Sequence, residues 1–175
     1  MINYLNLSET LFKFIKPIEL EDIEFTTRHD WVYKRTTDVM TTEGIDWFKQ
    51  RGIKFYPTSN LFKIAKNCEG PIHDDGIDFA INFIIKGYGT MEWVNDLDAT
   101  RLITRFHNLD YIVYKDVKSF NVCDTWKGKL ALVRVKSPHR IVTTDVDRYC
   151  LSIRSESPKT FDEAYKLLYN TDAEC

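Results

Sequence analysis

The feature that most constrains this chain is a series of short apolar runs separated by polar turns, which begins near Lys54 and ends near Arg154. Runs of this length, rich in β-branched and aromatic residues, are typical of β-strands. No segment between them is long enough for a helical crossover, so neighbouring strands are expected to run antiparallel. The eight predicted strands are residues 62–66, 78–86, 90–94, 101–106, 111–114, 129–135, 139–143 and 148–154. The sequence therefore predicts a mainly β fold, an antiparallel sandwich or barrel.

The two ends of the chain carry helical patterns. Residues 42–52 combine a capping Thr42, a short amphipathic turn and a terminating Gly52. After Pro158, Thr160 and Glu163 have the spacing of a capping box that opens a helix through Tyr169. With 175 residues the chain is expected to form one domain. Its predicted parts are a helical N-terminal support (1–53), a β core (54–156), and a C-terminal helix and tail (157–175).

Composition excludes several classes of function. Lys and Arg number 24 against 26 Asp and Glu, so there is no strong nucleic-acid signal. No apolar run reaches the roughly 18 residues that span a membrane, and the N-terminus does not have the pattern of a signal peptide. The four cysteines form no C-x-x-C pair and are expected to be reduced thiols. A cytoplasmic protein without a membrane partner is the expectation, or host-cytoplasmic if the gene belongs to a phage.

Two of the four histidines, His73 and His139, stand at the starts of predicted strands. In an extended chain residues i and i+2 point to the same side, so His73 and Asp75 can converge on one metal ion. His139 is the available third ligand, and two histidines with one carboxylate form a face that leaves positions open on an octahedral iron. Two other interpretations remain: Asp75 can cap backbone amides in a turn, and each histidine can be an ordinary hydrogen-bonded residue.

The strand at 148–154 places Arg148, Cys150, Ser152 and Arg154 on one face. An arginine that points inward is costly to bury unless an anion pairs with it, and a guanidinium matches a carboxylate through two parallel hydrogen bonds. Either Arg148 or Arg154 is therefore a candidate for binding a carboxylate. The alternative is that Arg148 only pairs with a nearby acidic residue in the preceding turn, at Asp145 or Asp147.

In these motifs the sequence resembles the iron(II)- and 2-oxoglutarate-dependent oxygenases. The likeness is carried by His73-x-Asp75, by Pro138-His139, and by the final strand from Arg148 to Arg154, and it covers roughly residues 54 to 156. It is closest to the small aspartyl/asparaginyl β-hydroxylase-like and phage-encoded members. Cys150 stands where some relatives have serine.

The resemblance implies a double-stranded β-helix, or jelly roll, with flanking helices. It also implies that His73, Asp75 and His139 hold Fe(II) and that Arg148, rather than Arg154, binds the distal carboxylate of 2-oxoglutarate. The partners would then be 2-oxoglutarate and dioxygen, with succinate and carbon dioxide released as an unidentified substrate is hydroxylated. A protein side chain, a nucleobase or a small molecule would each suit this chemistry.

Four further residues are candidates around such a site. Asn82 and Ser152 are expected to contact the co-substrate or the metal ligands, with Asp74 as another group near those ligands. Trp93 is the candidate for lining a substrate pocket, although an aromatic residue on a strand also packs in cores. Two other functions remain open: a non-catalytic jelly-roll structural or binding module, and a cupin-like metal protein that uses the same ligands without a keto acid.

Overall fold

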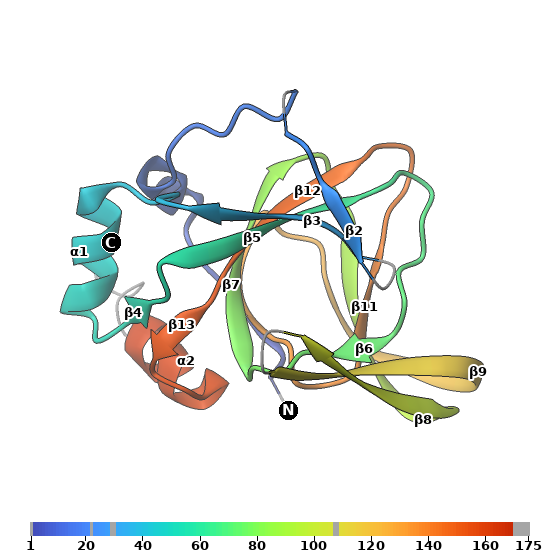
Figure 1. The fold of residues 1–175 in the computed structure, drawn as a ribbon. Helices are drawn as coiled ribbons and strands as arrows, with labels where there is room; N and C mark the ends of the chain where they lie inside the picture. Colours follow the sequence, from blue (N-terminus) through green and yellow to red (C-terminus); the bar gives the residue numbers. More distant parts are fainter. Residues whose placement is uncertain (1, 22, 29–30, 107–108, 170–175) are drawn as a thin grey trace.

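The computed structural model (Figure 1) describes residues 2–21, 23–28, 31–106 and 109–169. The fold is mainly β and has the jelly-roll architecture expected from the sequence. Seven strands form one sheet in the order β1-β10-β7-β12-β5-β3-β2, and four strands, β11-β6-β9-β8, close into a second layer. The helices lie together at one end of the molecule, beside a small two-stranded sheet of β4 and β13.

The elements follow the chain in a simple order. The strands of the seven-stranded sheet are β1 (Tyr4–Asn6), β2 (Thr26–Arg28), β3 (Trp31–Thr37), β5 (Thr58–Ile64), β7 (Phe79–Lys86), β10 (Leu130–Arg134) and β12 (Arg148–Ile153). The second layer consists of β6 (His73–Asp74), β8 (Thr90–Phe106), β9 (Leu109–Trp126) and β11 (His139–Val142). The remaining elements are η1 (Glu9–Phe14), α1 (Thr42–Gln50), β4 (Lys54–Phe55), β13 (Ser155–Ser157) and α2 (Phe161–Tyr169).

The prediction that residues 1–53 form only a helical support is wrong in part. This segment supplies one 3-10 helix and one α-helix, but it also adds β1 to one edge of the seven-stranded sheet and β2 and β3 to the other. The reason is that these short strands are completed by distant partners: β1 pairs with β10 and β3 pairs with β5. Local sequence patterns do not reveal such pairings.

Strands β8 and β9 pair along most of their length as one long ribbon, where the sequence predicts three separate short strands. The polar residues between 95 and 100, which indicate a turn in the sequence, lie within this ribbon where its register shifts. Asp96 and Asp116 both have positive φ angles there, near +50°. Because this part of the ribbon is largely exposed on both sides, it lacks the alternation that identifies a half-buried strand.

The central strands β7 and β12 are buried on both faces, so each contributes to two separate cores. Phe83 and Leu151 face η1, α1 and α2 in the larger core, where both are fully buried. Ala80 and Cys150 face the space between the two layers, together with Trp93 and Trp126. This division confirms the two faces predicted for the last strand, and it makes the inner face of β12 one wall of an interior cavity.

The C-terminal helix begins as the sequence predicts. The Thr160 hydroxyl accepts a hydrogen bond from the Glu163 amide, and the Glu163 carboxylate accepts one from the Thr160 amide, so the capping box is formed. Asp78 accepts a hydrogen bond from the Phe161 amide at 2.6 Å, which joins this helix to the start of β7. No helix in the described ranges has the length and apolar character needed to cross a membrane.

Candidate metal centre

The structure brings His73, Asp75 and His139 together between the two layers of strands. Strands β6 and β11 are antiparallel neighbours in which His73 and His139 stand directly opposite each other. Their ring centroids are 4.1 Å apart, and ligand atoms of all three residues lie within 4.8 Å of one another. Asp75 follows β6 directly, and its amide donates to the Val135 carbonyl, which fixes the backbone of the third ligand. A single metal ion can contact all three groups.

Both imidazoles are oriented for metal binding by backbone carbonyls. His73 Nδ1 lies 2.9 Å from the Pro71 carbonyl and His139 Nδ1 lies 2.8 Å from the Ser137 carbonyl. Since a carbonyl only accepts, each Nδ1 carries the proton and each neutral ring keeps its lone pair on Nε2. Burial lowers the pKa of both histidines, strongly for His73, whose neighbour His139 lowers it further. Both rings are therefore in the neutral form that binds metals at neutral pH.

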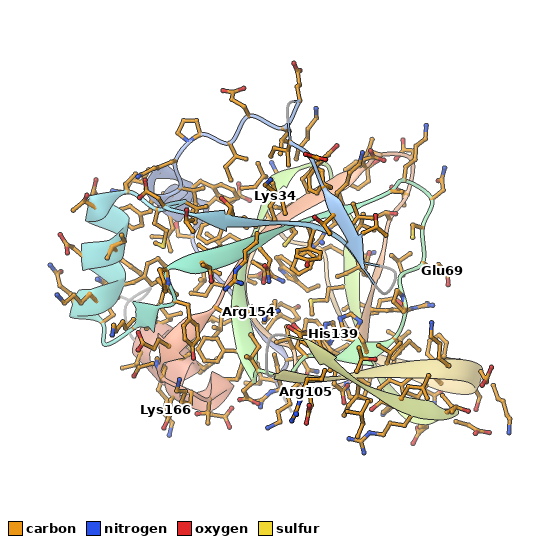
Figure 2. The ribbon with its side chains drawn as sticks, viewed as in Figure 1. Lys34, Glu69, Arg105, His139, Arg154 and Lys166 are labelled. Atoms are coloured by element: carbon orange, nitrogen blue, oxygen red, sulfur yellow. The ribbon has the colours of Figure 1, made fainter. Side chains whose placement is uncertain are left out.

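Asp75 lies between a histidine and an arginine. Its Oδ1 is 3.8 Å from His73 Nε2, and its Oδ2 is 3.8 Å from Arg154 Nη2. The Arg154 side chain is nearly buried and also lies beside the ring of Tyr111. Figure 2 shows Arg154 and His139 in the interior of the molecule, whereas Lys166 and Glu69 lie at its surface. The geometry thus places the positive charge of Arg154 beside the negative charge of Asp75, the carboxylate of the candidate metal centre.

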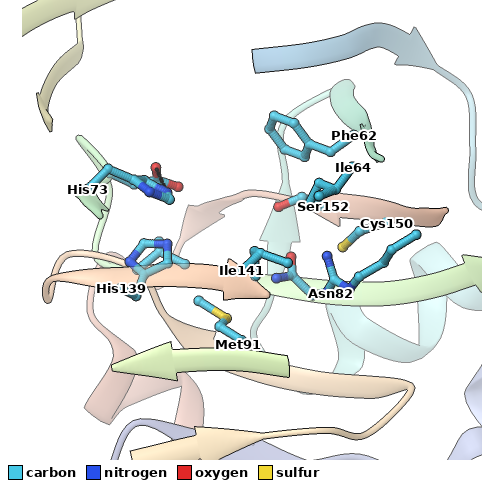
Figure 3. A pocket seen from close by; sticks show the side chains of 12 residues that line it. Phe62, Ile64, His73, Asn82, Met91, His139, Ile141, Cys150 and Ser152 are labelled. Carbon is cyan, nitrogen blue, oxygen red and sulfur yellow. Dashed lines mark ion pairs between the residues drawn. The ribbon is translucent and has the colours of Figure 1, made fainter. Parts of the chain in front are cut away.

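A cavity of about 50 Å³ extends from the histidines to the inner face of β12. In Figure 3, His73 and His139 lie at one end, and Asn82, Cys150 and Ser152 at the other. The lining residues combine polar groups with an apolar wall, and they are Phe62, Ile64, His73, Asp75, Asn82, Met91, Val135, His139, Ile141, Arg148, Cys150 and Ser152. Three of the four candidates for binding a co-substrate, Arg148, Asn82 and Ser152, are therefore in this lining.

Arg148 is the most unusual member of the lining because only 2% of its surface is exposed. Its Nε and Nη2 atoms are buried without a hydrogen-bond partner among the described residues, while the guanidinium contacts the Cys150 thiol. A buried cation with unused donors is costly unless an anion pairs with it. The Oδ1 of Asn82 is likewise buried and unpartnered in the described structure. The unused donors of Arg148 suit a carboxylate, whereas the Asn82 oxygen is an acceptor and needs a donor from whatever binds there.

Neither acidic residue of the preceding turn neutralises Arg148 in the structure. Asp145 accepts a hydrogen bond from the Tyr88 hydroxyl at 2.5 Å, and Asp147 accepts one from the Lys66 amide at 2.9 Å. Asp147 also lies 3.4 Å from the ammonium group of Lys63. Their carboxylates thus stabilise the turn itself, and the structure does not support the alternative in which Arg148 serves only as their partner.

Asp74 occupies a different environment from the one expected for a residue that supports the metal ligands. It points away from His73 and Asp75 along β6, and its Oδ2 accepts a hydrogen bond from the Tyr114 hydroxyl at 3.1 Å. Burial raises the pKa of Asp74 to about 6. Its role in the structure is to join β6 to the long hairpin. Support for the metal ligands comes instead from the backbone carbonyls and from Arg154.

Trp93 does not belong to the cavity lining, and the interpretation of this residue as a substrate contact needs correction. Its side chain is 1% exposed, its indole N–H donates to the Arg134 carbonyl at 2.7 Å, and its ring stacks on Tyr4. Residue 93 stands opposite His139 in the ladder and shares a strand face with Met91, so alternation directs its ring to the same side as the cavity. The ring stays out of the lining because it packs against Tyr4 in the core. The strand pattern alone did not show that Tyr4, on the distant strand β1, covers this ring.

We expect the Trp93→Phe variant to be less stable than the natural protein by about 1 kcal/mol, because a buried hydrogen bond is lost while most of the apolar contact remains. Urea denaturation checks this value, and the metal affinity of the folded variant should be unchanged. A variant with full stability and weakened ligand binding would instead place Trp93 in the site.

Sequence reasoning missed the apolar side of the cavity. Met91 and Ile141 are cross-strand partners on β8 and β11, and Phe62 and Ile64 share one face of β5. The spacing of Phe62 and Ile64 is a usable signal, since i and i+2 residues on a strand point to the same side. His29 and His107 lie outside the described residues.

Comparisons with known proteins give only distant likenesses. No protein-family model and no curated protein matches the chain. Among solved structures, the plu4264 protein of Photorhabdus luminescens is 14% identical, with a TM-score of 0.43 over 87% of this chain and 96% of that one. A single-residue mutant of Bacillus subtilis oxalate decarboxylase is 10% identical, with a TM-score of 0.40 over 81% of this chain. Vicilin from hazelnut, Corylus avellana, is 7% identical, with a TM-score of 0.42 over 80% of this chain.

This chain spans 30% of the oxalate decarboxylase chain and 33% of the vicilin chain. All three TM-scores are below 0.5, so these likenesses carry no argument about chemistry. The fold and the candidate metal centre therefore rest on this chain's own strands and residues.

Proposed function

We propose that the protein is an Fe(II)- and 2-oxoglutarate-dependent oxygenase, in which His73, Asp75 and His139 hold the metal and Arg148 binds the distal carboxylate of the co-substrate. The observation that carries this proposal is the position of Arg148, buried at the far end of the cavity that the three metal-binding residues open into. A metal-binding triad alone suits many proteins. The triad together with a buried, unsatisfied guanidinium suits a metal-bound keto acid with a second carboxylate.

The residues present fit this cofactor. Two neutral imidazoles with their Nε2 atoms directed inward, plus one carboxylate, match the donor set and open face of non-haem iron sites. When bound, the metal and the keto acid supply the oxidative chemistry that activates dioxygen. Arg154 lies on the Oδ2 side of Asp75, so a bound metal would be held through Oδ1, the oxygen nearer His73. Coordination through one oxygen keeps positions open for the co-substrate.

The far end of the cavity is built to orient a carboxylate. Arg148 offers two unused N–H donors, and Asn82 and Ser152 add polar groups beside it on the neighbouring strands β7 and β12. A charge-assisted pair of this kind is stronger in a site from which water is excluded. Met91 and Ile141 provide the apolar wall between the two polar ends. The protein residues therefore bind the co-substrate, orient its carboxylate and keep bulk water away from the metal.

A second candidate is a cupin-like metal protein that uses the same ligands without a keto acid. The size of the cavity favours it. About 50 Å³ is room for a few water molecules, since each needs roughly 10 to 15 Å³ by this measure. A five-carbon dicarboxylate then requires side chains of the lining to move apart. A smaller anion on Arg148 requires less rearrangement.

An anaerobic titration distinguishes the candidates. The metal-free protein is titrated with Fe(II) and then with 2-oxoglutarate, and the visible charge-transfer band of a keto acid chelated to iron is recorded. We expect the band to appear and to saturate at one equivalent. Iron binding without the band would favour the cupin-like candidate. Failure to bind iron in a folded protein would favour a structural or binding module.

A further inference from the structure

The loop between β7 and β8, residues 87–89, crosses the beginning of β12 at very short range. Gly87 has a φ angle of +75°, and a Cβ at this position would collide with the Asp147 carbonyl. The Tyr88 hydroxyl donates to Asp145, which ties the loop to the turn that precedes β12. The Gly87-Tyr88-Gly89 loop is therefore held against the residue that follows this turn, which is Arg148.

Gly89, unlike Gly87, does not have a positive φ angle. A side chain is excluded at this position because the surrounding atoms leave no room for a Cβ. An added Cβ would lie 2.9 Å from Arg148 Cδ, 2.8 Å from the Val142 carbonyl oxygen and 3.3 Å from Thr143 Cγ2. Real Cβ atoms essentially never approach other atoms more closely than 3.0 Å, so any larger residue at position 89 forces a neighbour to move. The backbone of Gly89 thus forms a wall against the aliphatic part of the Arg148 side chain.

Of the three neighbours, Arg148 can move most easily. Val142 is fixed by its pairing with Thr90, and the Thr143 hydroxyl donates to the Ala65 carbonyl. The main chain of Arg148 is also fixed, because it pairs with Ile64 in β5. Its side chain, however, borders the cavity, which offers space for a displaced guanidinium. A substituent at position 89 would therefore push the guanidinium out of its present position.

We infer that Gly89 is a positioning residue for the carboxylate subsite, because its missing side chain sets where the Arg148 guanidinium stands in the cavity. The inference rests on the proposed function for its significance. It adds a residue that neither touches the metal nor lines the cavity, and it explains why the polar loop before β8 passes so close to β12.

A double-mutant cycle on thermal stability tests this contact without metal or co-substrate. Gly89→Ala is made in the natural chain and in the Arg148→Ala variant, which lacks the Cδ atom. If Gly89 makes room for Arg148, Gly89→Ala lowers Tm less in the Arg148→Ala background, by about 3 °C. Equal losses of Tm in the two backgrounds would mean that the Val142 carbonyl alone is obstructed, and the inference would be wrong. The cycle can still be interpreted if Gly89→Ala alone is poorly folded. In that case the inference predicts that the double variant recovers folding.

Binding measurements then connect the contact to the subsite. We expect Gly89→Ala to weaken 2-oxoglutarate binding to the Fe(II)-loaded protein by about tenfold, with Fe(II) affinity within twofold of the natural protein. The matched control is Gly70→Ala, whose Cβ would approach the Ile141 carbonyl at 3.1 Å without nearing Arg148. Equal loss of 2-oxoglutarate binding in both variants would indicate general disturbance of β11 and would overturn the inference.

The two proposals can fail separately. If the natural protein binds no 2-oxoglutarate, the proposed function fails, yet the stability cycle still decides whether Gly89 positions Arg148. If the natural protein binds the keto acid and the cycle shows no coupling, only the inference about Gly89 fails.

Discussion

His139→Ala should reduce Fe(II) affinity by more than about 100-fold and remove the keto-acid charge-transfer band. Even residues that only support a metal ligand change affinity by about 10- to 100-fold, so loss of one of three direct ligands should exceed that range. His139 is 3% exposed and its ring lies at a tilt beside that of His73, so its removal opens a buried part of the centre. Calorimetric titration with Fe(II) under anaerobic conditions measures the effect.

The matched control is Ser152→Ala, which changes the same cavity at its other end and leaves all three ligands in place. Its Fe(II) affinity should equal that of the natural protein. Circular dichroism must show that both variants retain the fold, because a buried histidine also contributes to packing. Comparable Fe(II) affinity in folded His139→Ala and in the control would exclude His139 as a ligand.

Asp75→Ala should also lose the metal, but with an additional loss of stability. The Arg154 guanidinium lies 3.8 Å from Asp75 and is nearly buried, so removal of the carboxylate leaves an uncompensated charge in the interior. Removal of one partner of such a pair is commonly costly, by about 3 to 5 kcal/mol when the pair is fully buried. The partial exposure of both groups reduces that figure here. The histidine variants are therefore the clearer test of metal binding.

Arg148→Met should weaken 2-oxoglutarate binding by about 100-fold and leave Fe(II) binding unchanged. A hydrogen bond to a charged group contributes about 1.5 to 3 kcal/mol, and two parallel bonds to one carboxylate account for a loss of this order. Methionine keeps the aliphatic volume and removes the charge. Because Nε and Nη2 have no partner in the described structure, the variant without ligand should be at least as stable as the natural protein.

The comparison with Arg154→Met identifies which arginine binds the carboxylate. Both residues lie on the inner face of the same strand region, but Arg154 is beside Asp75 while Arg148 borders the opposite end of the cavity. Arg154→Met should therefore alter Fe(II) affinity first. If 2-oxoglutarate affinity fell in Arg154→Met and stayed unchanged in Arg148→Met, the roles of the two arginines would be reversed. Unchanged affinity in both would leave the subsite without a carboxylate partner.

The sequence by itself determined that the fold is mainly β, and it determined the direction of the key side chains on β12. Alternation with a period of two places Arg148, Cys150 and Ser152 on one face of β12, and the structure has all three in the cavity lining. The same rule brings the ligand atoms of His73 and Asp75 to one side. The capping box at Thr160 likewise follows from residues three positions apart. Each of these features depends on near neighbours in the chain, which a local pattern records.

The tertiary structure alone decided which distant residues meet. His73 and His139 face each other because β6 pairs with β11, and Arg154 reaches Asp75 across the interior. Trp93 packs against Tyr4 of β1 instead of lining the cavity, and residues 1–53 supply sheet strands, for the same reason. The physical cause is that register between strands far apart in sequence is set by the combined packing of both sheets. No short segment contains that information. The sequence pattern therefore identifies candidate side chains, and only the pairing of distant strands shows which of them lie together in a site.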